Sequence, residues 1–576
     1  MLFINKNQQG SAVYRITALL IMACFLGVVV SFLAIAFVEC VFWLNNILFI
    51  APHSRIQIQD SWVLPTLTLL VPTAGGLLVG YLFQKLSPTH HVLGPVDSIY
   101  AVQLRRELPN WRSGLISTGA SILSLGCGAS VGQYGPMVYL GSMMGDLVAK
   151  LQFRIPNLNS IAIACGVAAA ISTAFNAPIA GLIFAHEVIL RHYSLQSFAP
   201  TTVAAATGYV VANVVFDRPP LFLVQFDGVA HSHEFLLFGL LGFSCALLAT
   251  GFMHLVLASG KVSSKLRLAP MFHPAIAGLI VGLVALVLPE VLGTGRETLR
   301  FAIVEGAFES KELFMLVTAK MALTALCIGF GFAGGVFSPA LLIGILFGAL
   351  SWSVLEIMGV PNSGVVVYAI CGMMAFNTAV IGAPLTTILI VYELTRNYDL
   401  TIAAMVSVVF ANLLAFRIFG RSLFDVQLAR RGIDLSLGRD RVILEHTPVS
   451  QYMINDYLKF APDTAVTTAI KTIKASKHTE AVIVDNEQFL GITTIQSLLQ
   501  QDEENRTDSS ICSSWPRFNE STSVWQAMRS LNDFAGNGIP VVNADNQLLG
   551  IVTEADLIKA YMEIAHGIRR EENAVV

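Results

Sequence analysis

Residues 126–136 read Gly-Cys-Gly-Ala-Ser-Val-Gly-Gln-Tyr-Gly-Pro, and residues 329–339 return the same outline as Gly-Phe-Gly-Phe-Ala-Gly-Gly-Val-Phe-Ser-Pro. Both stretches begin with Gly-x-Gly and end with proline. A second pair follows in the same order, because residues 176–187 resemble residues 382–393 at nearly the same offset. Paired interrupted segments are typical of transporters built from two repeats, with the binding site at the repeat interface. The sequence alone leaves open whether the repeats are inverted or parallel.

The composition around these stretches is that of a membrane protein. The chain has 576 residues, of which 55% are hydrophobic and 13% charged, whereas soluble domains are about 25% charged. Apolar runs recur from residues 18–49 to residues 401–416, and the first is too long for a cleaved signal peptide. The net charge of −3 gives no basic field for a nucleic-acid partner. We therefore expect a polytopic, multi-pass domain over residues 1–440.

The composition changes near residue 440, where a soluble tail begins. Arginines cluster just past the last apolar run, which predicts that this end lies in the cytoplasm. The tail contains a repeat of its own, over residues 446–502 and 511–568, and each copy reads as an amphipathic helix followed by β-branched strands and another helix. The tail is therefore expected to hold two small α/β domains.

The glycine-rich junctions suggest what the membrane domain does. Glycine permits a tight turn and leaves backbone N–H groups accessible where the next helix begins. Such a helix N-terminus in a medium of low dielectric constant attracts anions without a buried cationic side chain. Two N-termini directed at one point would hold a partly dehydrated anion weakly enough to release it. Close helix packing through small residues is the alternative explanation, and the duplication favours the anion site.

These motifs resemble the CLC family of chloride channels and chloride/proton antiporters. The family's GREGP motif is similar to residues 132–136 (Gly-Gln-Tyr-Gly-Pro), and its GGxFxP motif is similar to residues 334–339 (Gly-Gly-Val-Phe-Ser-Pro). The resemblance implies an all-α membrane domain with inverted repeats, a homodimer with one anion pathway per subunit, and chloride as substrate. It implies no enzymatic activity and no required cofactor, and a place in the bacterial inner membrane. It also implies that opposed backbone amides line the pathway, from Gln133, Tyr134 and Gly135 on one side and Val336, Phe337 and Ser338 on the other.

The departures from the family pattern bear on mechanism. The antiporters carry a gating glutamate at the position of Tyr134, and a phenol with a pKa near ~10 does not change charge at physiological pH. A second, inner glutamate of many antiporters falls here on Val188. Glu187 precedes it by one residue and would point about 100° away on a helix. Both proton stations are therefore expected to be missing.

The central anion site departs as well. The family's tyrosine near the last membrane segment aligns with Phe424, and its serine-containing turn is matched only loosely around Gly94, without the serine. Two hydroxyl donors are lost, each worth roughly 1.5–3 kcal/mol toward a charged partner. The Tyr134 hydroxyl either replaces them or plugs the path, and we favour replacement.

The tail resembles a tandem pair of CBS domains, which often bind ATP or another adenine nucleotide. The ribose-binding pattern G-h-h-T-x-x-D is complete at residues 550–556, where Thr553 and Asp556 are the candidate ligands. The first copy keeps Thr494 but has Ser497 in place of the aspartate, so the first site is in doubt. A dimerisation or folding role without ligand is equally compatible with the sequence.

The remaining candidates are weaker. His90 and His91 are adjacent, and neighbouring ligands diverge, so we interpret them as a loop pair rather than a metal site. His186 beside Glu187 is either a proton relay or a structural pair, and Glu393 is expected to cap or brace the structure. The eight cysteines contain no CxxC pair and are interpreted as apolar fillers.

The sequence thus favours a passive chloride channel of the CLC type, regulated through its CBS pair. Two alternatives stay open: an antiporter with a different proton route, through Tyr134 or Glu187, and an anion-binding membrane sensor whose output is the CBS pair. Divalent-cation transport is disfavoured because the glycine-rich junctions carry no acidic residues.

Overall fold

The structure is a computed structural model that describes residues 6–56, 62–151, 155, 157–218, 226, 228–502, 505–512, 515–531, 534 and 536–573. The chain divides into two compact units. The first, called the membrane unit below, ends at Gly432, and the second, the C-terminal unit, runs over Ile433–Asn573. Each unit is described by itself.

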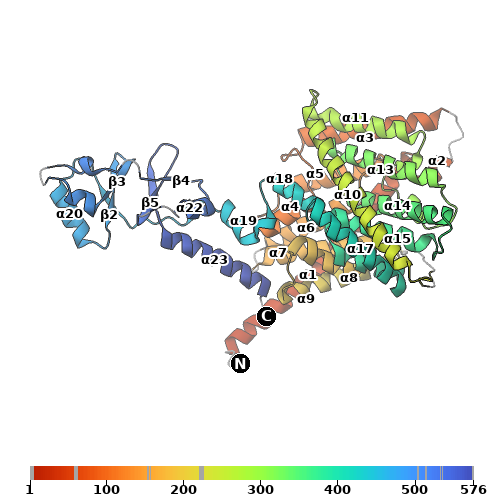
Figure 1. Ribbon diagram of the computed structural model, residues 1–576, viewed down its shortest axis with the longest axis horizontal. Coiled ribbons are helices and arrows are strands. Elements are labelled where there is room, and N and C mark those ends of the chain that lie inside the picture. The colour runs from red at the N-terminus through yellow and green to blue at the C-terminus, as the bar shows by residue number, and fades with distance from the viewer. Residues whose placement is uncertain are drawn as a thin grey trace. The chain divides into compact units, whose positions relative to one another are not determined.

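The membrane unit is helical (Figure 1). Its first part contains α1 (Lys6–Ile47), α2 (Pro52–Ile56), α3 (Val63–Lys85), α4 (Pro95–Gln103), α5 (Trp111–Gly126), α6 (Tyr134–Ala149), α7 (Leu158–Phe175), α8 (Pro178–Phe184), the π-helix η1 (Ala185–Leu190), α9 (Leu195–Val210) and the π-helix η2 (Val211–Val215). Its second part contains α10 (Glu234–Lys265), η3 (Pro270–Phe272), α11 (His273–Ala285), η4 (Pro289–Val291), α12 (Arg296–Phe301), α13 (Ser310–Gly329), α14 (Phe337–Ile357), α15 (Val365–Ile381), α16 (Pro384–Thr395), α17 (Tyr398–Ile418) and α18 (Leu423–Arg430).

Helix length and composition agree with the expected polytopic domain. Within the described residues, eight helices are long and apolar enough to cross a membrane, and four more are apolar but shorter. The expected glycine and proline interruptions are helix boundaries, since α5 and α13 end at Gly126 and Gly329, and α8 and α16 begin at Pro178 and Pro384. Proline fits the first turn of a helix, where its missing N–H costs nothing.

Glycines also allow two equivalent helix pairs to pack closely. A Cβ on Gly141 of α6 would lie 2.4 Å from the Gly166 carbonyl oxygen of α7, and a Cβ on Gly344 of α14 would lie 2.6 Å from the Gly372 carbonyl oxygen of α15. Such contacts between backbones are how helices associate in membranes without a hydrophobic driving force. Close packing therefore accounts for glycines inside these helices, while the turns at the helix N-termini use other glycines.

The C-terminal unit contains two copies of one α/β motif, as expected. The first copy has β1 (Leu458–Phe460), α20 (Val466–Ala475), β2 (Glu480–Asp485), β3 (Gln488–Thr494) and α21 (Ile495–Leu499); the second has β4 (Phe518–Asn519), α22 (Val524–Ser530), β5 (Gly538–Val542), β6 (Leu548–Thr553) and α23 (Glu554–Asn573). In each sheet the first strand is parallel to the second, and the second is antiparallel to the third. The short helices η5 (Leu435–Leu437), α19 (Arg439–His446) and η6 (Val449–Gln451) precede the first copy, and η7 (Thr507–Ser510) follows it.

Candidate functional site

The two glycine-rich turns, about 200 residues apart in the sequence, pair directly with each other. Gly132 and Gly335 form an antiparallel bridge in which the Gly132 N–H donates to the Gly335 carbonyl at 2.7 Å and the Gly335 N–H donates to the Gly132 carbonyl at 2.8 Å. A side chain on Gly132 would meet the Gly335 oxygen at 2.8 Å and the Ser338 nitrogen at 2.9 Å. Only glycine lets the two backbones approach this closely. The bridge therefore places the N-termini of α6 and α14 side by side.

Both helices begin with free backbone donors. Tyr134 and Gly135 open α6 and Phe337 and Ser338 open α14, and each first turn continues with a proline. The structure gives none of these four N–H groups an acceptor within the described residues. Unpaired N–H groups at two adjacent N-termini create a positive potential suited to an anion.

The first aromatic residue of each helix, Tyr134 and Phe337, belongs to one aromatic cluster. The Tyr134 ring, 6% exposed, stacks on Phe175 with centroids 4.0 Å apart, and it meets Phe337 edge to face at 5.2 Å. The ring centroids of Phe184 and Phe337 are 6.2 Å apart, so Phe184 lies at the margin of the cluster. Stacking on Phe175 fixes the orientation of the Tyr134 ring. An uncharged aromatic side chain, held by ring stacking, therefore stands where the sequence analysis expects a gate.

The Gln133 amide is already engaged. Its N–H donates to the Ser338 hydroxyl at 3.2 Å, which is a second link between the two turns. Of the six amides that the sequence assigns to the anion pathway, this one stabilises the pairing of the turns in the structure described here.

The Gly94 turn is closed in a similar way by Asp97. Gly94 is the N-cap of α4, and its N–H donates to the Asp97 carboxylate at 2.8 Å. The other Asp97 oxygen pairs with Arg431 at 2.8 Å, and the His91 ring lies 3.8 Å from it. Burial alone would raise the pKa of the Asp97 carboxyl, but the neighbouring His91 and Arg431 outweigh it and lower that pKa. The Gly94 N–H therefore already has an anionic acceptor.

Phe424 lies in the first turn of α18, a helix whose start is well defined. Ser422 is the N-cap and accepts from the Asp425 N–H at 3.1 Å. Asp425 in turn pairs with Arg191 at 2.7 Å, and both side chains are largely buried. The Phe424 ring is 6% exposed and has no hydroxyl to offer an anion.

Glu187 and Val188, the inner proton-site positions, lie on η1. Glu187 accepts hydrogen bonds from the backbone N–H groups of Leu385 at 3.0 Å and Thr386 at 2.8 Å, and from the Thr386 hydroxyl at 2.7 Å. Glu187 therefore caps the N-terminus of α16. Val188 is buried and apolar.

Glu393, the repeat counterpart of Glu187, makes the equivalent capping contact at the start of α8. It accepts from the N–H groups of Ile179 at 2.9 Å and Ala180 at 2.7 Å, at the start of α8. The expectation that Glu393 braces the structure is thus confirmed. Glu187 lies just beyond the end of α8 and caps the start of α16, and Glu393 lies in the last turn of α16 and caps the start of α8. The two helices therefore run antiparallel, as inverted repeats require.

In the C-terminal unit, the two nucleotide-site patterns are helix caps. The Thr553 hydroxyl donates to Asp556 at 2.6 Å at the start of α23, and Thr494 and Ser497 form a capping box at the start of α21. A cavity of about 400 Å³ lies at the opposite end of the sheets, near the β2–β3 turn at Asn486, and Thr494 and Thr553 do not line it. The structure thus gives these residues a structural contact.

Comparisons with known proteins agree with this geometry. The family described as voltage gated chloride channel matches residues 75–415, and the CBS domain family matches residues 449–504 and 516–563. The chain belongs to the voltage gated chloride channel family. The C-terminal unit is a tandem CBS pair, and the whole is an integral, multi-pass membrane protein of the CLC type.

Individual relatives are named both as chloride channel proteins and as H(+)/Cl(-) exchange transporters. The chain is 29% identical to a ClcB-like chloride channel protein of Ralstonia nicotianae, over 72% of this chain and 98% of the relative. It is 28% identical to the H(+)/Cl(-) exchange transporter ClcA of Klebsiella pneumoniae, over 74% of this chain and 93% of the relative. Among solved structures, a slow cyanobacterial Cl-/H+ antiporter aligns with a TM-score of 0.64 and 23% identity, covering 72% of this chain and 97% of the other.

One important residue of this CLC protein was missed from the sequence. Lys320 of α13 is 1% exposed, and its ammonium donates to the carbonyls of Val291 and Gly293 at 2.8 Å each. The Gly293 N–H donates in turn to Gly128, in the turn that leads to α6. Lys320 therefore fixes the loop that supports the first glycine-rich turn. A lone charge inside an apolar run was the available signal.

The histidine candidates have other partners. His186 is fully buried, and its two ring nitrogens contact the His192 carbonyl at 3.2 Å and the Thr201 hydroxyl at 3.1 Å, not Glu187. His90 contacts the Phe83 carbonyl at 3.2 Å. Within the described part of the chain, no three histidine, cysteine or acidic side chains gather as a metal site would need.

Proposed function

We propose that this CLC protein is a passive anion channel that carries chloride, in which Tyr134 takes the place of a proton-carrying gate. The observation that supports it is the pair of α6 and α14 N-termini, joined by the Gly132–Gly335 bridge and presenting unpaired N–H groups. Helix N-termini attract an anion without binding it so tightly that it cannot leave.

The surroundings of Tyr134 support an uncoupled mechanism. A neutral phenol stacked on Phe175 does not take up and release protons near neutral pH, as a gating carboxylate would. Glu187 is committed to capping α16 through three hydrogen bonds, and Val188 has no titratable group. Neither gate position nor inner position offers a proton carrier.

The charge near the gate also suits anions. Arg296, at the start of α12, acts electrostatically on Tyr134, and the nearby Arg218 is paired with Glu39 at 2.6 Å. Cationic groups that gather close to a pathway raise the local anion concentration and the rate of entry.

A chloride/proton antiporter is the second candidate, because relatives named as H(+)/Cl(-) exchangers match along most of their length.

We further propose that the protein is a homodimer in the bacterial inner membrane. The CBS pair would lie in the cytoplasm, as the arginines after α17 favour. Regulation of flux by ATP or another adenine nucleotide at Thr553 and Asp556 is part of the proposal.

Anion efflux from proteoliposomes, with external pH recorded at the same time, tests the mechanism. Chloride efflux with a flat pH trace is expected for the wild-type protein. The variant Tyr134→Glu restores a titratable group and is expected to make flux depend on pH, while Tyr134→Phe keeps the trace flat. Proton uptake in fixed ratio to chloride by the wild-type protein would overturn the channel and support the antiporter. Absence of any flux in both wild type and Tyr134→Ala would overturn anion transport through this site.

A further inference from the structure

The loop between η4 and α12 is anchored to both elements that form the anion site. The buried Lys320 ammonium donates to the Gly293 carbonyl at 2.8 Å, and the Gly293 N–H donates at 2.9 Å to the carbonyl of Gly128, in the turn that leads to α6. Gly295 has a φ of 66° and lies against Leu342 of α14, so a side chain there would collide with that leucine. The first residue of α12 therefore follows a loop that contacts both the turn before α6 and α14.

Arg296 is that first residue, and its charge is not matched. The residue is exposed, and within the described part of the chain its guanidinium makes neither a hydrogen bond nor an ion pair. Two further arginines lie near enough to repel it, Arg218 and Arg300. The carboxylates nearby act on those two, since Glu39 pairs with Arg218 at 2.6 Å and Glu297 attracts Arg300. Like charges gathered in one place attract an ion of opposite charge. A bound anion would supply the charge that Arg296 lacks.

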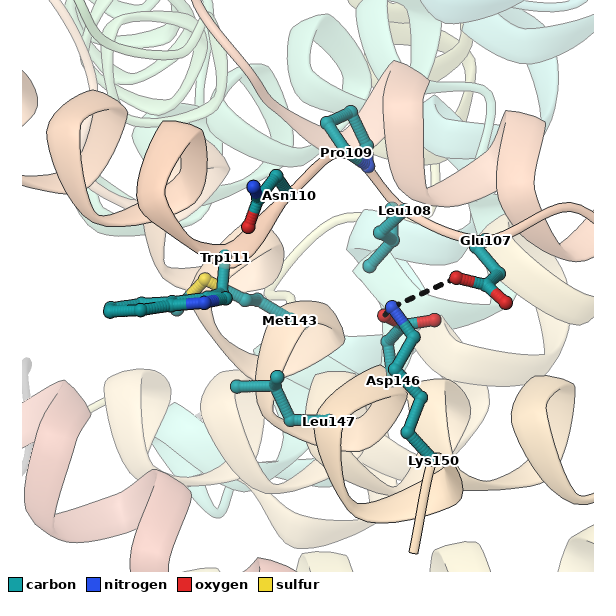
Figure 2. A pocket seen from close by; sticks show the side chains of 9 residues that line it. All are labelled: Glu107, Leu108, Pro109, Asn110, Trp111, Met143, Asp146, Leu147 and Lys150. Atoms are coloured by element: carbon teal, nitrogen blue, oxygen red, sulfur yellow. Dashed lines mark ion pairs between the residues drawn. The ribbon is translucent and has the colours of Figure 1, made fainter. Parts of the chain in front are cut away.

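Another charged cluster of the membrane unit gives the opposite result. A cavity of about 340 Å³ lies where α5 begins and α6 ends, and its charged lining residues are Glu107, Asp146 and Lys150 (Figure 2). There a single cation, Lys150, faces two carboxylates, Asp146 at 2.9 Å and Glu107 at 3.1 Å. These groups leave a negative charge in excess, so that cavity does not suit an anion.

Arg296 also lies where it can act on the gate position. Its charge acts electrostatically on Tyr134. The contact of Gly295 with Leu342 places the start of α12 against α14, whose first residue, Phe337, meets the Tyr134 ring edge to face. A guanidinium offers several N–H donors and stays charged at any physiological pH, so it can replace part of the hydration of an anion. The exposed Arg296 would thus hold an anion before it reaches the nearly buried Tyr134.

We propose that Arg296 binds a small monovalent anion at an entrance to the pathway, beside Tyr134, and thereby sets the chloride concentration at which the pathway fills. The inference rests on the proposed anion transport. It applies equally to an uncoupled channel and to a proton-coupled antiporter, because either must take up the anion first. Arg296 adds a cationic side chain to a site that otherwise consists of backbone N–H groups at two helix N-termini.

Chloride flux into proteoliposomes, measured over a series of chloride concentrations, tests the proposal. We expect Arg296→Gln to raise the half-saturating concentration by about fivefold or more and to keep the maximal rate within about twofold, because the lost interaction concerns binding. Arg296→Lys keeps the charge and should stay within about twofold of wild type. Arg300→Gln, an exposed arginine one turn farther along α12, is the matched control and should also stay within about twofold. An unchanged half-saturating concentration in Arg296→Gln, or an equal rise in Arg300→Gln, would overturn the assignment.

Chemical modification separates the charge of residue 296 from its size. Arg296→Cys is treated with a cationic or with an anionic methanethiosulfonate reagent, and wild type treated in the same way controls for the exposed Cys24 and Cys40. The cationic reagent should restore the half-saturating concentration to within about twofold of wild type, and the anionic reagent should raise it further. Equal effects of the two reagents would overturn a role for the charge.

Isothermal titration calorimetry of the purified full-length protein with chloride makes the test independent of transport. Arg296→Gln is expected to bind chloride about fivefold more weakly than wild type, and Arg300→Gln is expected to bind it as wild type does. Equal affinities in wild type and Arg296→Gln would overturn the inference even if chloride flux is observed. Absence of flux in the wild type would instead contradict the proposed transport, and the affinities would still decide the role of Arg296.

Discussion

The turns before α6 and α14 share a backbone arrangement but differ in where they place their hydroxyl groups. Both pair through the Gly132–Gly335 bridge, and both place an aromatic residue first in the helix, Tyr134 in one and Phe337 in the other. The hydroxyl groups, however, are at different positions, on the ring of Tyr134 and on Ser338 one residue later in α14. The repeat therefore supplies a symmetric scaffold, whereas the polar groups near the anion are asymmetric.

This asymmetry has a direct structural result. The Ser338 hydroxyl accepts from the Gln133 N–H, and glycine at the equivalent position of the first repeat, Gly135, has no side chain with which to return that contact. The link between the turns is thus made by the second repeat only. The backbone bridge thus depends on both copies, whereas this side-chain link depends on one.

The largest expected effect comes from separating the turns. Gly132→Ala places a Cβ 2.8 Å from the Gly335 oxygen and 2.9 Å from Ser338 N, so the backbones must move apart. We expect a loss of about 1–3 kcal/mol in the free energy of unfolding, together with near loss of chloride flux. Thermal unfolding and liposome efflux measure the two. Gly119→Ala on α5, where the new Cβ meets nothing within 4 Å, is the control and should leave both close to wild type.

A smaller effect is expected from the reciprocal caps. Glu187→Ala leaves two backbone N–H groups and one hydroxyl unpaired, whereas Glu393→Ala leaves two N–H groups. Hydrogen bonds to charged groups contribute about 1.5–3 kcal/mol, so we expect losses of that order in unfolding free energy, larger for Glu187. The glutamine variants keep an acceptor and should lose less. A Glu187→Ala protein of unchanged stability but altered proton movement would instead assign Glu187 to a proton route.

Local signals in the sequence predicted much of this scaffold. Glycine and proline affect the backbone at their own positions. The ends of α5 and α13 and the starts of α8 and α16 could therefore be predicted from the sequence. The closure of the Gly94 turn could also have been found, because Asp97 lies three residues on, at the spacing of a capping box.

The contacts between repeats could not be found in this way. The exchange of caps by Glu187 and Glu393 and the stacking of Phe175 on Tyr134 join residues far apart in the chain. Local sequence patterns do not indicate which buried side chain contacts which helix end. Lys320 was detectable as a charge in an apolar run, but its partners, two loop carbonyls, depend on the tertiary fold.

The two hydroxyl groups themselves are tested by a matched pair of variants. Ser338→Ala removes the acceptor of the Gln133 N–H, and we expect a loss of about 1 kcal/mol in unfolding free energy with a modest change in flux. Tyr134→Phe keeps the ring stacked on Phe175 and should leave stability within about 0.5 kcal/mol of wild type while changing chloride flux severalfold. The opposite order, with Tyr134→Phe affecting only stability and Ser338→Ala only flux, would reverse the roles assigned to the two repeats.

The smallest effect concerns the start of α4, a third helix near the turns, and it depends on pH. The Asp97 carboxylate, 3.8 Å from the His91 ring, raises the pKa of His91 above its usual value near 6.5. Protonated His91 therefore stabilises the fold fully below that value, and the contribution is lost as the pH rises through the raised pKa. The His91 side chain is half exposed, so the contribution is at most about 0.5 kcal/mol. Wild type should exceed His91→Gln in thermal stability at pH 6 and match it by pH 9, whereas His90→Gln, which alters a ring bonded to the Phe83 carbonyl, should show no such convergence. A His91→Gln deficit that stays constant from pH 6 to pH 9 would mean that the ring acts by packing, and that Asp97 closes the Gly94 turn with Arg431 alone.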